Sequence, residues 1–104
     1  MPKELYLEIG EQMKQNHGCQ TGQMFGKPCL KTNGKAFAAF FKEQMVFKIG
    51  AEEIKEIKEK YPSSKNWDPS GKNRAMKDWL QVPNEFQDDW ESLATQAMNF
   101  VSKA

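Results

Sequence analysis

The dipeptide Asn33-Gly34 is the feature that most constrains how this chain folds. Both residues tolerate positive φ angles, so the pair is the strongest short signal for a two-residue turn between antiparallel strands. The segments on either side, residues 29–32 and 36–41, are rich in apolar side chains, and residues 44–49 alternate between apolar and polar positions. The sequence therefore predicts a three-strand antiparallel meander.

Three other segments have the period of an amphipathic helix. Leu5, Ile9 and Met13 recur every four positions near the start of the chain. A shorter pattern ends at Pro62, which cannot continue a helix, and a longer one repeats apolar residues as far as Val101. We predict helices over residues 3–16, 51–61 and 86–102.

The stretch between the second and third helices is predicted to be a polar loop followed by one more strand. The tetrapeptide Asp-Pro-Ser-Gly at 68–71 has the composition of a type I turn. Residues 76–82 then alternate, with Leu80 on one face and Trp79 on the other. The predicted fold class is α+β: a three-strand meander plus one or two later strands, with an N-terminal, a short middle and a C-terminal helix.

Length and charge limit the classes of function. A chain of 104 residues fits one domain, which we place over residues 1–104. Fifteen Lys and Arg oppose fourteen Asp and Glu, so the chain lacks the strong basic excess of many nucleic-acid binders, although folding can still gather a weak basic patch. No segment has the length of a transmembrane helix, and the N-terminus does not read as a signal peptide. We expect a cytoplasmic protein with no membrane contact.

The chemistry-bearing residues do not form a recognisable catalytic or metal-binding set. The chain has one histidine, His17, and two cysteines, Cys19 and Cys29, without a Cys-x-x-Cys or His-x-x-x-His pair. We expect two free thiols, with a Cys19–Cys29 disulfide as the minor alternative. The sequence therefore predicts no catalytic residue, no metal and no cofactor; thiol chemistry at Cys29 is the alternative.

Several of these segments together resemble the TfoX N-terminal domain family. The likeness rests on Met24-Phe25-Gly26, on Asn33-Gly34-Lys35-Ala36-Phe37-Ala38, and on Leu80-Gln81-Val82-Pro83-Asn84-Glu85-Phe86 followed by the last helix, and it extends from Met24 to Val101. The resemblance implies an α+β architecture similar to secretion-chaperone-like and YjbR-like domains, and no catalytic residues. The chain looks closer to stand-alone, uncharacterised members than to the longer competence regulators, which carry a second domain. Fold alone does not transfer their regulatory role.

Aromatic side chains on the predicted strands suggest a partner surface. Phe37 and Phe41 are predicted to point one way and Phe40 the other. If helices cover one face of the sheet, then Phe40, Val46 and Trp79 remain on the second face, where an apolar patch is typical of a partner surface or a dimer interface. The alternative is that both faces are covered within the monomer.

The loop before the last strand is the one basic stretch that contains an aromatic residue. Trp67 lies among Lys65, Lys72, Arg74 and Lys77, a mixture that can bind single strands or phosphates. The alternative is that Trp67 plugs the sheet while the lysines are solvated. The complete candidate partner surface is Phe40, Val46, Trp67, Lys72, Arg74 and Trp79.

These observations favour a non-catalytic protein-binding or regulatory module, whose partner is a second copy of the chain in a homodimer or another protein. The alternative is a small nucleic-acid-associated protein similar to a transcription or competence regulator, motivated by the resemblance and by the basic loop.

Overall fold

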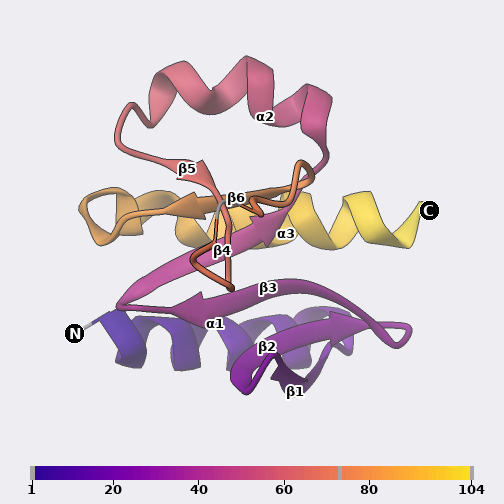
Figure 1. The fold of residues 1–104 in the computed structure, drawn as a ribbon. Helices are drawn as coiled ribbons and strands as arrows, with labels where there is room; N and C mark the ends of the chain where they lie inside the picture. Colours follow the sequence, from indigo (N-terminus) through magenta and orange to yellow (C-terminus); the bar gives the residue numbers. More distant parts are fainter. Residues whose placement is uncertain (1, 73, 104) are drawn as a thin grey trace.

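The computed structural model of the protein describes residues 2–72 and 74–103. Its strands form one antiparallel sheet in the order β1-β2-β3-β4-β6-β5, flanked by helices (Figure 1). The predicted α+β class is confirmed. In chain order the elements are α1 (Pro2–His17), β1 (Gln20–Met24), β2 (Lys27–Thr32), β3 (Lys35–Phe41), β4 (Gln44–Lys48), α2 (Ala51–Ile57), the 3₁₀ turn η1 (Lys58–Lys60), β5 (Lys65–Asn66), β6 (Trp79–Val82), the 3₁₀ segment η2 (Asn84–Asp89) and α3 (Trp90–Ser102).

The helices α1 and α3 cover one face of the sheet and lie behind it in Figure 1. Tyr6 of α1 packs on Phe40 of β3 with ring centroids 5.4 Å apart. Trp90, the first residue of α3, is fully buried in the same core, and α2 joins it through Ile54. This face is therefore the main core of the domain.

The other face of the sheet is covered by residues 67–72 and 74–76, which we call the 67–76 segment and which cross in front of β4 in Figure 1. Trp67 and Val46 have no exposed surface, and Trp79 is only 5% exposed. Partly buried Met76 closes the edge of this second cluster. Of the two alternatives that the sequence left open, the structure adopts the one in which both faces are covered within the chain.

Two-residue turns with positive φ at both positions join the first four strands. Asn33 and Gly34 have φ angles of 52° and 78°, so the predicted hairpin is confirmed. The same geometry recurs at Phe25-Gly26 and at Lys42-Glu43, where side chains other than Asn or Gly occupy the left-handed region.

A bulge between β2 and β3 overturns part of the predicted alternation. Lys31 pairs with Ala36 and Leu30 pairs with Ala38, so Phe37 has no partner across the ladder. The extra residue shifts the phase of the strand by one, and Phe37 joins Phe40 in the core under the helices. The prediction that Phe37 shares a face with Phe41 is therefore wrong, as is the placement of Phe40 on the second face.

Some boundaries also differ from those predicted. The strand β1 was not predicted, β5 lies within the predicted loop, and β6 begins three residues later than predicted. The middle and last helices each include a 3₁₀ segment, η1 after α2 and η2 before α3. Within the described residues, no helix is long and apolar enough to cross a membrane.

Candidate functional site

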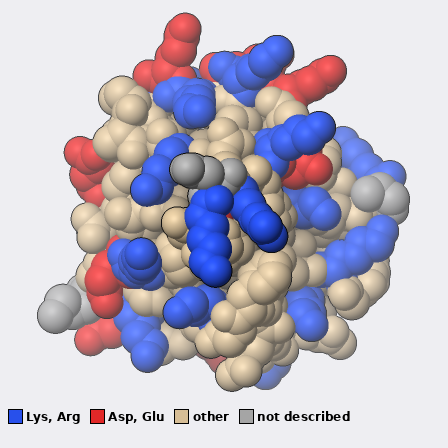
Figure 2. Space-filling view, viewed as in Figure 1, with Lys and Arg blue, Asp and Glu red and all other residues tan. Residues whose placement is uncertain are grey.

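Charge divides between the two sides of the molecule, although the chain is nearly neutral overall. Residues 18–50 and 61–83, which hold the strands and the 67–76 segment, carry nine Lys and Arg but three Asp and Glu. Residues 1–17 and 84–104, which hold α1 and α3, carry three Lys and seven Asp and Glu, whereas residues 51–60, which hold α2 and η1, are mixed, with three Lys and four Glu. Figure 2 shows the first side, with Lys and Arg spread across it and Asp and Glu mainly at its edges.

A groove on this side runs between the α2–η1 unit and the strands. It has a volume of about 580 Å³, and Lys42, Lys58 and Lys65 contribute to its lining together with the ring of Phe41. A second hollow of about 320 Å³ adjoins it through Lys58 and Asn66, and adds Lys55 and Lys77. We call this continuous feature the lysine groove, defined by Lys42, Lys55, Lys58, Lys65 and Lys77.

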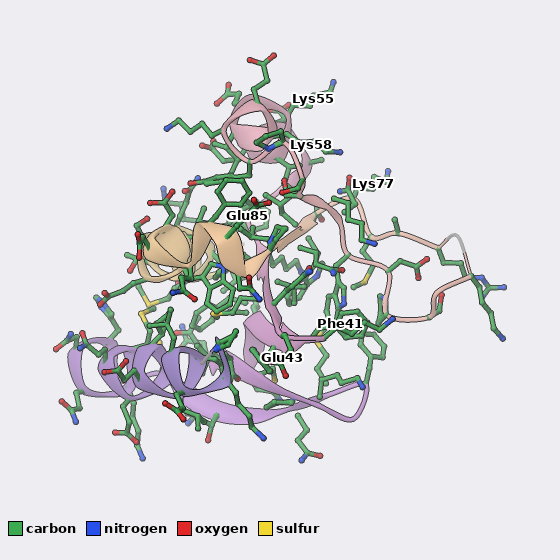
Figure 3. The ribbon with its side chains drawn as sticks, turned by 90° about the vertical axis from the view of Figure 1, so that its left-hand side faces the viewer. Phe41, Glu43, Lys55, Lys58, Lys77 and Glu85 are labelled. Carbon is green, nitrogen blue, oxygen red and sulfur yellow. The ribbon has the colours of Figure 1, made fainter. Side chains whose placement is uncertain are left out.

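Figure 3 views the sheet nearly edge-on, with α1 and α3 on the left and the 67–76 segment on the right. Lys55 and Lys58 come from α2 and η1 above the sheet, and Lys77 lies just below them on the right. Phe41 lies lower on the same side. Lysines from several elements therefore meet on the side away from the long helices.

Hydrogen bonds to β6 and to Asn66 fix the walls of the lysine groove. The start of α2 is attached next to β6, because Ala51 N donates to Asp78 Oδ1 over 3.1 Å and Gly50 N donates to the Asp78 carbonyl over 3.1 Å. Asn66 Nδ2 donates to the carbonyls of Met76 and Lys77, each over 3.2 Å, while its Oδ1 accepts a bond of 3.5 Å from Lys58 Nζ. Asn66 thus links the two sides of the groove.

Asp68 organises the loop that presents Lys72 and Arg74. Its Oδ1 accepts bonds from the Ser70 hydroxyl (2.7 Å) and from the amides of Ser70 and Gly71, and its Oδ2 accepts from the amide of Arg74 (3.0 Å). The Ser70 hydroxyl and the three amides lower the pKa of this carboxyl. The carboxylate is therefore bonded within its own loop. The turn predicted at 68–71 is also present, because Gly71 N donates to the Asp68 carbonyl over 3.3 Å.

The structure separates the six predicted surface residues into two groups. Lys72 and Arg74 are exposed as expected. Phe40, Val46, Trp67 and Trp79 are buried, so the prediction of an exposed apolar face built from them is wrong. The reason is physical: α1 covers Phe40, and the aromatic ring of Trp67 covers the second face, as the plug alternative had it.

Three lysines of the groove were not predicted as members of a site: Lys42, Lys55 and Lys58. They come from the β3–β4 turn, α2 and η1, and only the tertiary fold brings them to one groove. The available signal was weak: Lys55 and Lys58 are three residues apart on one predicted helix, which places them on neighbouring positions of its surface.

The thiols lie in the interior. Cys29 is fully buried in the second cluster, and burial raises the pKa of its thiol, an effect that Lys31 partly offsets. Cys19 is free and buried under the helices, where its Sγ donates to Met98 Sδ over 3.6 Å, and burial raises its pKa as well. His17 is exposed at the end of α1. Across residues 2–72 and 74–103, no three His, Cys, Asp or Glu side chains are grouped so as to hold a metal ion.

Comparison with known families gives one match. The sequence model of the TfoX N-terminal domain matches residues 11–104, nearly the whole chain. A search of curated proteins and a search of solved structures found no match.

Proposed function

This chain belongs to the TfoX N-terminal domain family, and we propose that it is a non-catalytic module that binds nucleic acid through its basic side. The lysine groove is the observation that carries the proposal. Five lysines line two adjoining hollows, against one carboxylate, Asp68, which is bonded to its own loop, and this excess of positive charge favours a polyanion as the ligand.

The shape and chemistry of the groove favour a phosphate backbone. Asn66 and Gln81 also line the groove, but Asn66 is bonded to its walls and Gln81 Nε2 donates to Gln44 Oε1 over 2.6 Å, so the lysines are the groups that can bind a phosphate. Lys72 and Arg74 extend the positive surface along the 67–76 segment, which Asp68 holds in place. A row of cations on an ordered scaffold neutralises several phosphates at once, which gives salt-dependent affinity without sequence readout.

The protein-binding function expected from the sequence has less support. It depended on apolar side chains at Phe40, Val46 and Trp79, and these are buried. A homodimer would need a different surface. The non-catalytic part of the proposal is supported by the buried thiols, and free thiols in the interior suit a protein that acts in the reducing cytoplasm.

The test is a binding titration with matched charge reversals. A fluorescent oligonucleotide is titrated with wild-type protein by anisotropy at low salt, and the titration is repeated as salt rises. Lys58→Glu/Lys65→Glu removes two cations of the groove, and we expect it to weaken binding about tenfold or more and to reduce the salt slope by about two. Lys3→Glu/Lys14→Glu changes the net charge equally on α1 and should change affinity about twofold at most.

Two results would overturn the proposal. The first is absence of binding at low salt. The second is equal loss in both double variants, which would mean that the lysine groove has no special part. Binding of polyglutamate in place of the oligonucleotide would instead identify an acidic protein as the partner.

A further inference from the structure

Three large hydrophobic side chains are exposed among the described residues, and Phe25 is the most exposed of them, with 62% of its surface in water. It occupies the first position of the turn between β1 and β2, with φ of 53°, followed by Gly26 at 74°. A bulky residue is an outlier in this left-handed region, where Asn or Asp fits better. The position therefore carries a backbone cost and leaves most of an apolar ring in water.

The ring of Phe25 is nevertheless held by its neighbours. It makes a T-shaped contact with Trp67, with ring centroids 6.0 Å apart and an angle of 72° between the planes. Trp67 in turn packs on Phe41 and Trp79, at 5.6 Å and 5.1 Å. Phe25 is the most exposed member of this aromatic cluster: its ring contacts Trp67, and most of its surface is accessible to solvent.

Positive charge surrounds this cluster. Lys27 Nζ lies 5.6 Å and Lys42 Nζ 5.3 Å from the centroid of Phe41. Phe41 and Lys42 also line the lysine groove, so this aromatic cluster borders the groove at Phe41. Phe25 and Phe41 both pack on Trp67, and Lys27 follows Phe25 by two residues, so the exposed ring belongs to the same cluster as two cations that a phosphate backbone can contact.

We propose that Phe25 is a stacking platform for an unpaired base, and that the nucleic acid bound by this domain is single-stranded. The inference rests on the proposed function and adds the form of the ligand. A base of a single strand can leave its neighbours and stack on a fixed aromatic ring, with its phosphates on Lys27 and Lys42. The bases of a duplex are already stacked and paired, so they cannot use Phe25.

The variants separate stacking from turn geometry and from packing. Phe25→Asn supplies the residue that the turn favours and removes the ring, so the domain is expected to stay folded. Phe25→Trp keeps an aromatic surface, and Phe25→Leu keeps an apolar side chain without a π face. Leu7→Asn is the matched control, because Leu7 is an exposed apolar residue (55%) on α1, on the acidic side. Thermal unfolding followed by circular dichroism verifies that each variant is folded.

The experiment compares a short oligo(dT) with a duplex of equal length, by anisotropy at low salt. We expect wild type to prefer the single strand. Phe25→Asn and Phe25→Leu should each lose about 5- to 100-fold in affinity for oligo(dT) and keep their duplex affinity, whereas Phe25→Trp and Leu7→Asn stay near wild type.

The outcomes distinguish the two proposals. If wild type binds both ligands and Phe25→Asn binds oligo(dT) as wild type does, the stacking platform is refuted while the basic groove stands. A preference of wild type for the duplex also refutes it. If neither ligand binds at low salt, the proposed function fails and this inference fails with it.

Discussion

Trp67 packs its indole on that of Trp79 with ring centroids 5.1 Å apart, and this contact attaches the 67–76 segment to the second face of the sheet. Two backbone bonds reinforce it: Trp67 N donates to the Trp79 carbonyl over 3.1 Å, and Met76 N donates to the Trp67 carbonyl over 2.9 Å. One side chain thus fills the second core and also sets where Lys72 and Arg74 are presented.

Removal of the Trp67 ring should be costly. We expect Trp67→Ala to lower the free energy of unfolding by about 3–5 kcal/mol, because a fully buried indole leaves a large cavity. Trp67→Phe should cost less, since a phenyl ring refills much of the cavity and Trp67 Nε1 has no hydrogen-bond acceptor among the described residues. Urea denaturation followed by circular dichroism measures both. Equal losses in the two variants would contradict the account in which the aromatic ring fills the second core.

The turn at Lys42-Glu43 is a place where the chain can be stabilised. Glu43 has a φ of 64°, a left-handed conformation that costs a residue with a side chain about 1–2 kcal/mol and costs glycine little. We expect Glu43→Gly to raise the free energy of unfolding by about 1 kcal/mol. Chemical denaturation is the measurement.

The β2–β3 turn allows the opposite substitution, in which a glycine with positive φ is replaced by a residue with a side chain. Gly34 has a φ of 78°, and a Cβ there would meet nothing within 4 Å, so any cost of a side chain comes from the backbone. Gly34→Ala should therefore lower stability by about 1–2 kcal/mol. If neither variant changes the unfolding midpoint, backbone strain at these turns is negligible and the expectation is wrong.

Short-range patterns in the sequence were sufficient for most of the fold. Asn33-Gly34 forms the predicted turn because its conformational preference is local. Met45 and Phe47 face the helices while Val46 faces the other way, as their alternation predicts. The two faces of β4 pack into different hydrophobic clusters, so the alternation of side chains decides which cluster each residue joins.

Features without a local signal were not predictable in this way. The strand Gln20–Met24 has a mostly exposed, polar sequence, so pairing with β2 alone makes it a strand. The bulge at Phe37 depends on the register in which β2 and β3 pair, and no local sequence pattern indicates that register. The lysine groove depends on α2 packing beside β6, which brings Lys58 near Asn66.

Acidification should loosen the loop that Asp68 organises. Because hydrogen bonds lower the pKa of Asp68 in the folded chain, its ionised form stabilises the loop. This contribution is fully present above the ordinary carboxyl pKa of about 4 and is lost as pH falls through the lowered folded value. We expect the amide signals of Ser70, Gly71 and Arg74 to titrate together below pH 4 in NMR spectra.

Asp68→Asn is the control for that titration. Its amide nitrogen cannot accept a bond, so one of the two groups of donors, either the Arg74 amide or the Ser70 and Gly71 donors, loses its acceptor. The variant should show shifted signals for one of these groups at neutral pH and no further change on acidification. A midpoint at or above the ordinary carboxyl value in wild type would contradict the hydrogen-bonded arrangement.

The two thiols should react slowly in the native protein, and this measurement also tests the alternative of a thiol enzyme at Cys29. Both side chains are buried, and burial raises both pKa values, so little thiolate is available near neutral pH. We expect an aromatic disulfide reagent to modify Cys19 and Cys29 only as fast as the fold opens, and to modify both at once in concentrated urea. Cys19→Ala and Cys29→Ala assign the two rates. Rapid modification of Cys29 in the folded protein near pH 7 would show an accessible, activated thiol, and the non-catalytic proposal would then be wrong.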